Sequence, residues 1–442
     1  MMTKVSVIMP SLNVAEYIEE CMDSIIGQTL NDIEIICIDA GSTDGTWEIL
    51  EGYKNAPAYG NKIRLYHSDI KSYGYQVNLG IKLARGDYIA VMETDDFADD
   101  HMYKDLVETA LLNDADAVRA NCKWFWTDKN GQRYYIAHNL WSRGDKRYNT
   151  MLDPGLNAYL YEQDYSLWKG IYKREFIIKN KIWLNETYGA SYQDIGFMMK
   201  FFTYAEKVFY LDRSFYRYRC DRENSSTSSM HSLHYAKQEF ETLMDDPGFW
   251  NKVRCKQGVY RRMASSFMAE YAKALTMAAY DTDSAYLSAD YGWFCMVLNT
   301  AIKRSEFNID YMPNSTREDF ELLLNDYKSY ASKVKERNDL YRKKMDPYLK
   351  IIGSRELIIF GAGTYGKNAI QCFLNERIKP VVIFDNNEKL WGEAFLNISI
   401  VKPEHITENQ CVIIAAKYHG AEFVAQLKDM GVQADQIMFW RN

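Results

Sequence analysis

Short apolar runs alternate with amphipathic segments over the first hundred residues. The runs "VSVIM" (5–9), "IEIICI" (33–38), "KIRLY" (62–66) and "YIAVM" (88–92) have the length and the β-branched content of strands. Between the first two runs, the apolar positions of residues 15–26 fall on one face of a helix. This alternation predicts a βαβ arrangement with a parallel sheet, whose ligands bind at the carboxyl ends of the strands.

The pattern changes twice further along the chain. Residues 115–220 are mixed and rich in aromatic side chains, and residues 233–345 contain long helical stretches with few breakers. A second α/β pattern then begins near residue 355 with "ELIIF", "GAGTYG" and "VVIF". We therefore expect three parts: an α/β domain over 1–230, a helical region over 231–350 and a small Rossmann-like α/β domain over 351–442.

Composition narrows the class of protein. A chain of 442 residues with 47% hydrophobic and 26% charged residues is expected to form several globular domains. The net charge of -7 argues against a general nucleic-acid binder, which needs an excess of Lys and Arg. The eight cysteines form no CxxC pair and are expected to be reduced thiols. Without a visible secretory leader or a long apolar run, the sequence predicts a cytoplasmic protein.

Three carboxylates interrupt the fourth strand pattern in "VMETDDF" (91–97). If the strand continued to residue 95, alternation would place Glu93 and Asp95 on one face, with Asp96 starting the turn. Carboxylate oxygens at a strand end suit Mg²⁺ or Mn²⁺ completed by water and substrate phosphates. A solvated acidic turn is the alternative, and it is the better explanation for an isolated motif.

Several segments together carry a family resemblance. They are "VSVIMPSLNVAEYIEECMDSIIGQTLNDIEIICIDAGSTDGT", "NLGIKLARGDYIAVMETDDF", "LWKGIYKREF" and "YQDIGF". Their order and spacing resemble the large bacterial family of inverting nucleotide-sugar glycosyltransferases with the GT-A fold, of family 2 type, over roughly residues 3–230. The resemblance implies transfer of a sugar from a nucleotide diphosphate donor, a UDP-sugar by expectation, to a hydroxyl of a glycan or lipid-linked saccharide in the synthesis of bacterial surface polysaccharide or glycoconjugate.

The resemblance also implies which residues bind the donor. The positions that match the nucleotide-binding segments are Pro10, Asn13, Glu16, Asp39, Lys71 and Gly74. Ala40 stands where the family has a second acid, so the uracil contact does not carry over completely. Asp39 has an alternative role as a turn acid at the entry to a helix.

The "ETDD" block matches the metal-binding D-x-D motif of the family, with Glu93 in place of the first Asp. The two acids of the motif can be matched to residues 93 and 95 or to residues 95 and 96. Asp95 belongs to both alternatives, and we expect it to contact the nucleotide or the metal. Asp96 is the second predicted metal ligand, while Glu93 is expected to reach a ribose hydroxyl. The implied cofactor is Mn²⁺ or Mg²⁺.

The second half of the resemblance covers the reaction centre and the acceptor side. Asp194 in "SYQDIGF" matches the acid that supplies the general base, with Glu186 as the less favoured substitute. Trp168 and Lys169 match a segment near the donor sugar and acceptor, although a Trp in an apolar run is commonly a core residue. The loop containing Arg219, Arg222 and the serines of "NSSTSS" matches one that closes over the diphosphate.

The terminal α/β pattern provides a rival hypothesis. Gly361, Gly363 and Gly366 lie between a strand and a helix, and Asp385 ends the next strand, as in a dinucleotide fingerprint. We favour a structural or assembly role for this short segment. The alternative is an NAD(P)-dependent or nucleotide-sensing protein with a non-catalytic N-terminal domain that binds glycan or nucleotide. A homo-oligomer is left open, as is peripheral contact of the basic segment 333–344 with an anionic membrane.

Overall fold

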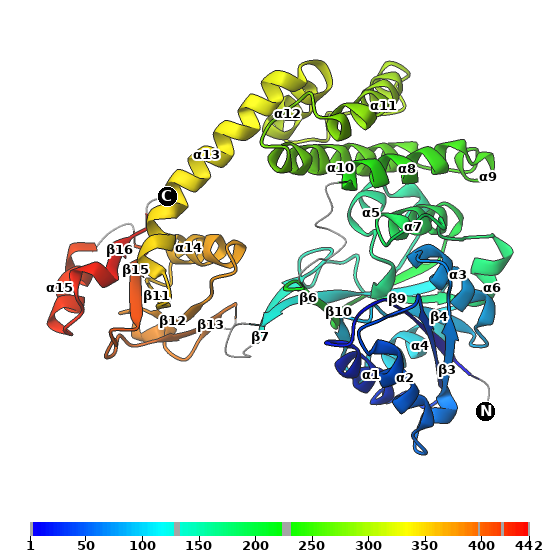
Figure 1. The fold of residues 1–442 in the computed structure, drawn as a ribbon, viewed down its shortest axis with the longest axis horizontal. Helices are drawn as coiled ribbons and strands as arrows, with labels where there is room; N and C mark the ends of the chain where they lie inside the picture. The colour runs from blue at the N-terminus through cyan, green and yellow to red at the C-terminus, as the bar shows by residue number, and fades with distance from the viewer. Residues whose placement is uncertain (1–2, 128–132, 223–230, 397, 417–419, 441–442) are drawn as a thin grey trace. The chain divides into compact units, whose positions relative to one another are not determined.

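The computed structural model describes residues 3–127, 133–222, 231–396, 398–416 and 420–440 (Figure 1). The chain forms two compact units, Met1–Phe125 with Ala137–Lys333 and Trp126–Ile136 with Val334–Asn442. Most of the helical region therefore belongs to the same unit as the N-terminal sheet. The domain boundaries expected at residues 230 and 350 stay predictions.

A mixed sheet is the centre of the first unit. Within the described residues its strands are β1 (Val5–Ser11), β2 (Ile33–Asp39), β3 (Ile63–His67), β4 (Tyr88–Val91), β5 (Phe97–Ala98), β6 (Ala117–Thr127), β7 (Arg133–His138), β8 (Met151–Leu152), β9 (Gly170–Lys173) and β10 (Val208–Arg219). The main path runs β3-β2-β1-β4-β9-β6-β10-β5. The strands β1 to β4 pair in parallel, as the alternation predicted, and β9 runs antiparallel between β4 and β6.

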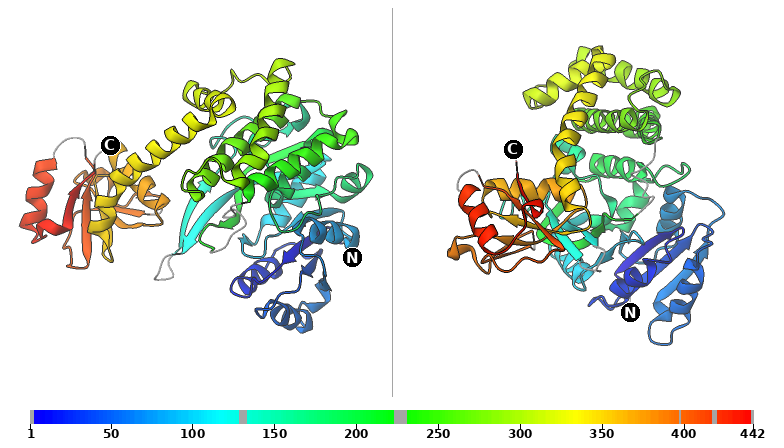
Figure 2. Two further views of the ribbon diagram at one scale, coloured as in Figure 1. Left: turned by 45° about the horizontal axis from the view of Figure 1, so that its top comes forward. Right: turned by 60° about the vertical axis from the view of Figure 1, so that its left-hand side comes forward.

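Helices flank this sheet and continue into the helical region. They are α1 (Ile18–Ile26), α2 (Thr46–Asn55), α3 (Tyr73–Leu83), α4 (Met102–Asn113), α5 (Ala158–Gln163), α6 (Arg174–Lys179), α7 (Gln193–Tyr204), α8 (Ser232–Asp245), α9 (Pro247–Trp250), α10 (Lys256–Met277), α11 (Ala285–Lys303), α12 (Asn314–Asn325) and α13 (Tyr327–Ile352). Helix α10 packs along α5, α8 and α11 (Figures 1 and 2). Within the first unit, the helical region is thus packed against α5.

The strand β1 is buried at every position, which is typical of a parallel strand covered on both faces. It runs through Pro10 to Ser11, beyond the predicted end at residue 9. The fourth strand was expected over residues 88–92, and β4 ends at Val91, so the condition of a strand that continues to residue 95 is not met. Met92 donates a last backbone bond to Ile8, and the chain then turns as the Thr94 hydroxyl bonds to the Pro10 carbonyl (2.9 Å each).

The second unit is a smaller α/β structure. Its further elements are β11 (Glu356–Phe360), α14 (Thr364–Asn375), β12 (Pro380–Phe384), β13 (Ala394–Phe395), β14 (Ile398–Val401), β15 (Gln410–Ile414), α15 (Gly420–Asp429) and β16 (Ile437–Phe439). The strand order is β13-β14-β12-β11-β15-β16, and the central pairs are parallel. The Rossmann-like pattern expected from residue 355 onward is present.

Two global expectations concern cysteines and membranes. All eight cysteines are free, and four of them, Cys21, Cys37, Cys122 and Cys411, are buried. Among the described residues, no helix combines the length and the apolar character that crossing a bilayer requires.

Candidate active site

The predicted donor-side residues gather where β1 and β2 end. Pro10 is buried in β1, while Asn13 and Glu16 are exposed in the segment between β1 and α1. Asn13 has a left-handed backbone (φ 51°) and bonds through its side-chain oxygen to the Thr43 amide at 2.9 Å. The β1–α1 and β2–α2 loops are therefore held together at the edge where parallel sheets bind ligands.

Asp39 organises the β2–α2 loop. Its Oδ2 accepts hydrogen bonds from the amides of Gly41 (2.9 Å) and Ser42 (2.8 Å), and its Oδ1 accepts from the hydroxyls of Ser42 (2.5 Å) and Ser11 (3.1 Å). The residue is 1% exposed. These contacts are those of the turn acid considered as its alternative role, and nucleotide contact by Asp39 stays a prediction.

The acidic cluster, Glu93, Asp95 and Asp96, follows β4, and its members differ in environment. Asp96 is 2% exposed, and its two oxygens accept bonds from the Tyr216 hydroxyl and the Arg219 amide, each at 2.7 Å. Burial raises the pKa of Asp96 well above its ordinary value, and the charge of Asp95 adds to the effect. Asp96 therefore joins the acidic cluster to β10.

Glu93 points toward helix α3. The Tyr73 hydroxyl donates to Glu93 Oε1 at 2.6 Å. Burial raises the pKa of Glu93 to about 8, while the Tyr73 bond opposes this effect. The negative charges of Asp95 and Asp194 also raise it, so the acidic cluster and the predicted base share one electrostatic environment.

Asp95 is the member that remains partly open, with 21% of its side chain exposed. Arg222 pairs with its Oδ2 at 2.9 Å. Arg219 donates to the Asp95 backbone carbonyl (2.8 Å) and pairs with Glu20 (2.9 Å). The two predicted arginines thus lie against the acidic cluster, whereas the serines of "NSSTSS" lie outside the described residues.

The donor set limits what metal site could form. Over residues 3–127, 133–222 and the other described ranges, no three or more His, Cys, Asp or Glu side chains come together as a metal-binding group. Asp96 has both oxygens engaged and Glu93 is bonded to Tyr73, which leaves Asp95 as the accessible carboxylate. These residues fit a divalent cation that arrives with a diphosphate and keeps water ligands, rather than an all-protein cage.

Helix α3 and the residues before it connect the predicted donor site to the loop that precedes the proposed catalytic base, Asp194. Lys71 is exposed, but its carbonyl accepts from the Gly189 amide, and the Tyr73 amide donates to the Gly189 carbonyl, each at 2.9 Å. Gly74 is buried against the backbone of Asn185, where a Cβ would overlap the carbonyl oxygen. These contacts place the 185–189 loop beside Lys71 and Gly74, which are predicted to bind the nucleotide.

Asp194 lies in the first turn of α7, where the helix dipole favours a carboxylate. Burial raises the pKa of Asp194 to about 6, against the lowering effects of the Ile195 amide and of Arg262. Its surface is still partly exposed. This combination, a reachable carboxylate with a raised pKa, suits a general base at neutral pH.

The substitute base is held differently. Glu186 accepts a 3.0 Å bond from Asn78 of α3. Its carboxylate thereby helps to fix the 185–189 loop, and nothing in its contacts favours it over Asp194.

Trp168 and Lys169 are both buried, in the short 3₁₀ turn Leu167–Lys169. The Trp168 ring stacks on Tyr216 (4.2 Å between centroids) and on Tyr218 (5.3 Å). Lys169 lies 3.7 Å from Asp164, which also pairs with the buried Arg119. These are core contacts, and a role of either residue toward the donor sugar stays a prediction.

Helix α10 carries residues that the sequence interpretation missed. Arg262 stacks on Tyr165 (3.8 Å) and its charge lowers the pKa of Asp194, while Glu270 accepts a 2.7 Å bond from Tyr192. Arg262, Ser266, Glu270 and Lys273 recur at spacings of four, four and three, so they lie on one helical face. This polar stripe along one face of α10 was the available signal.

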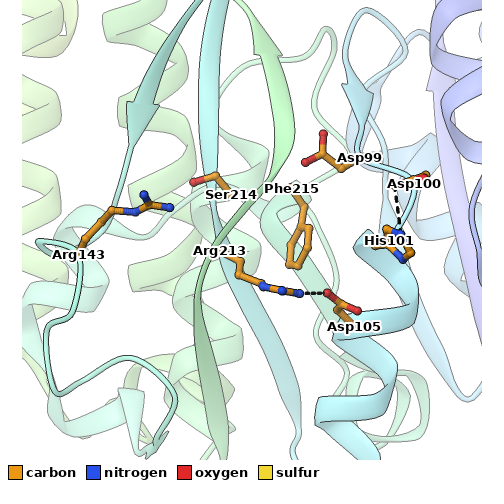
Figure 3. A pocket seen from close by; sticks show the side chains of 8 residues that line it. All are labelled: Asp99, Asp100, His101, Asp105, Arg143, Arg213, Ser214 and Phe215. Carbon is orange, nitrogen blue, oxygen red and sulfur yellow. Dashed lines mark hydrogen bonds and ion pairs between the residues drawn. The ribbon is translucent and has the colours of Figure 1, made fainter. Parts of the chain in front are cut away.

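An open hollow of about 510 Å³ lies elsewhere, between β10 and the start of α4 (Figure 3). Arg213 pairs with Asp105, His101 lies 3.8 Å from Asp100, and Asp99 pairs with Arg217 outside the hollow. None of its lining residues is a predicted site residue. The acidic cluster and Asp194 remain the candidate reaction centre.

The second unit keeps the form of a glycine-rich phosphate loop. Gly361 has φ +116°, and Gly366 packs where a Cβ would overlap the Gly361 carbonyl. Asp385 accepts bonds from the Ala362 amide (2.7 Å) and the Asn387 amide (2.8 Å). Its carboxylate therefore stabilises the loop itself in this structure.

Comparisons with known proteins agree with the N-terminal geometry. Residues 6–168 match the family Glycosyl transferase family 2, and residues 353–438 match C2185-like, N-terminal. The chain is 33% identical over 227 residues to the uncharacterized glycosyltransferase EpsJ of Bacillus subtilis, covering 51% of this chain and 64% of the relative. It is 33% identical over 230 residues to the uncharacterized glycosyltransferase YibD of Escherichia coli, covering 52% and 64%.

The alignment with a less similar relative covers a larger share of that relative's length. The cholesterol galactosyltransferase of Borreliella burgdorferi is 28% identical over 281 residues, which is 60% of this chain and 73% of the relative. The chain thus spans a little under two thirds of the first two relatives.

Solved structures show the fold. S. aureus TarS 1-349 aligns with a TM-score of 0.56 and 18% identity, over 75% of this chain and 91% of that one. The same protein in complex with UDP-GlcNAc aligns with a TM-score of 0.56 and 18% identity, over 75% and 92%. The GT-A fold class, a mixed sheet flanked by helices, is confirmed.

Proposed function

We propose, because residues 6–168 match Glycosyl transferase family 2, that this chain transfers a sugar from a nucleotide diphosphate-sugar to an acceptor hydroxyl with inversion. The observation that carries the proposal is the position of Asp194. Its carboxylate lies in the first turn of α7, close enough to the acidic cluster that its charge raises the pKa of Glu93.

The proposed reaction is a single displacement. The acceptor oxygen attacks the anomeric carbon, and the bond from that carbon to the diphosphate oxygen breaks. The nucleoside diphosphate leaves with the electron pair, and Asp194 takes the proton of the acceptor hydroxyl. Arg219 and Arg222, which lie against the acidic cluster, would compensate the negative charge of the leaving group.

Asp95 would hold the Mn²⁺ or Mg²⁺ of the proposal. When bound with the diphosphate, such a cation supplies charge stabilisation for the leaving group. The chain's own contribution is to present one partly exposed carboxylate, with Arg222 beside it, at the end of β4. Glu93 would face the ribose from its bond with Tyr73.

A UDP-sugar is the proposed donor. The UDP-GlcNAc complex of S. aureus TarS, which shares the fold, supports this choice. A glycan or lipid-linked saccharide is the proposed acceptor, in cytoplasmic synthesis of surface polysaccharide. Membrane contact through residues 333–344 stays a prediction, and Lys333 pairs with Asp319 at 2.7 Å.

A screen of nucleotide sugars with the full chain tests the proposal. We expect donor hydrolysis and transfer that depend on Mn²⁺, and a loss of about a hundredfold or more in the Asp194→Asn variant. Donor binding, measured by thermal shift, should survive in that variant. Asp245→Asn, an exposed aspartate of the same unit, is the matched control. Unchanged turnover in Asp194→Asn would refute the assignment of the base.

A further inference from the structure

The segment that carries the proposed base, residues 185–196, is held by the helical region. The Tyr192 hydroxyl donates to Glu270 Oε1 of α10 at 2.7 Å. Lys273 lies 3.4 Å from the other oxygen of Glu270 and 3.2 Å from the Ser232 hydroxyl. Two residues before Asp194, the chain is therefore anchored to a helix outside the family 2 match.

Tyr192 adopts an unusual backbone conformation at this anchor. It is the N-cap of α7 and has φ 70° and ψ -9°, in the left-handed region. A bulky residue is uncommon in this region and persists there where the surrounding structure fixes it. Such strain next to a proposed catalytic group points to a positioning role.

A second contact fixes the same segment from α8. Glu239 is 2% exposed and accepts a 2.8 Å bond from the Asn185 side chain. Its other oxygen lies against Gly196, where a Cβ would overlap it. Glu239 therefore contacts both ends of the base segment, and Glu270 bonds to Tyr192 between them.

We propose that Glu270 is a positioning residue, which holds Asp194 in its reactive orientation through the Tyr192 hydroxyl. The inference rests on the proposed function and adds α10; the family match ends at residue 168, before both the base segment and α10. The helical region is then a component of the reaction centre. Burial and the Glu270 carboxylate raise the pKa of Tyr192 well above its ordinary value, so the hydroxyl remains a donor.

The test compares Glu270→Ala, Glu270→Gln and Tyr192→Phe in the full chain. A misplaced base costs rate, so we expect kcat to fall about tenfold to a hundredfold in Glu270→Ala with the donor KM unchanged. Glu270→Gln keeps an accepting oxygen and should recover most of the rate. Tyr192→Phe should match Glu270→Ala, and the double variant should be no slower than either single variant.

Glu241→Ala is the matched control, because Glu241 is a half-exposed glutamate of α8 that pairs with Lys237 at 3.2 Å. If Glu270→Ala does not fold, Tyr192→Phe decides the test, because it removes a single oxygen atom. Wild-type kcat in Tyr192→Phe, or losses that add in the double variant, would overturn the inference. If Asp194→Asn keeps wild-type turnover, the proposed function fails instead, so the two failures are distinct.

Discussion

Tyr73 donates a 2.6 Å hydrogen bond to Glu93, and this bond joins helix α3 to the acidic cluster. Glu93 stands where the motif that the sequence resembles has Asp, and its carboxyl group accepts the bond from the tyrosine. The departure from the motif therefore has a structural partner on another element.

Removing that partner should have a measurable cost. We expect Tyr73→Phe to lower the free energy of unfolding by about 1–3 kcal/mol, because a buried oxygen of Glu93 loses its donor. Urea denaturation measures this change. Tyr75→Phe on the same helix is the control, since its hydroxyl makes no bond within the described residues. Equal effects of the two variants would contradict the prediction.

Asp95 should account for metal-dependent donor binding. In Asp95→Asn we expect the Mn²⁺-dependent affinity for UDP to fall by at least about a hundredfold, because an amide is a poor ligand for a hard cation. Calorimetry with UDP, with and without Mn²⁺, measures it. Asp100→Asn, an exposed acid five residues further on, should bind as the wild type does. Intact metal-dependent binding in Asp95→Asn would show that the ligand lies elsewhere.

The pH dependence of turnover should report Asp194. A base acts in its deprotonated form, and the pKa of Asp194 is raised to about 6. We therefore expect kcat/KM to rise with pH below about 6 and to level off above it. A profile of kcat/KM from acid to neutral pH checks this, and a limb near the ordinary aspartate value would contradict the environment described here.

Glu239 should make stability depend on pH. Burial raises its pKa from 4.5 to about 8 in the folded chain, so the protonated form stabilises the fold. That stabilisation is complete below the unfolded value of 4.5 and is lost as pH rises through about 8. Glu239→Gln cannot ionise, and we expect its stability relative to the wild type to improve as pH rises. Thermal unfolding of both proteins at several pH values measures the difference, and parallel curves would contradict it.

Gly363 separates the proposed function from the rival hypothesis. A Cβ at this glycine meets no atom within 4 Å, so Gly363→Val should leave the second unit folded while blocking a phosphate at the loop. We expect sugar transfer to survive unchanged in an activity assay. A collapse of activity would favour a nucleotide-dependent protein. Gly366→Val is not a usable substitute, since its Cβ would overlap the Gly361 carbonyl.

The sequence was sufficient for the parallel strands β1 to β4, but not for the other strands of the sheet or for the ends of its elements. The buried runs of β1 and β2 stand out because parallel strands are apolar on both faces. The pattern ended the fourth strand at residue 92 and allowed a continuation to residue 95, whereas the structure turns after Val91 as Thr94 bonds to Pro10. A side-chain contact of this kind overrides the local pattern.

The candidate site was predictable in its residues more than in its contacts. Asp95 and Asp194 follow from motifs, but the bonds Tyr216–Asp96 and Tyr192–Glu270 join positions far apart in the chain. One sequence carries no record of such pairs. The spacing of polar residues on α10 indicates a polar helix face, but it does not indicate that this face bonds to Tyr192.

The bridge between Ser72 and Gly189 has a consequence for protein engineering. Because the donor-side helix and the loop before the base share backbone hydrogen bonds, neither can be replaced alone without breaking the other's register. A chimera intended to accept a different sugar donor must carry residues 71–74 and 185–196 together from one parent. The two segments form one exchangeable module, although more than a hundred residues separate them in the chain.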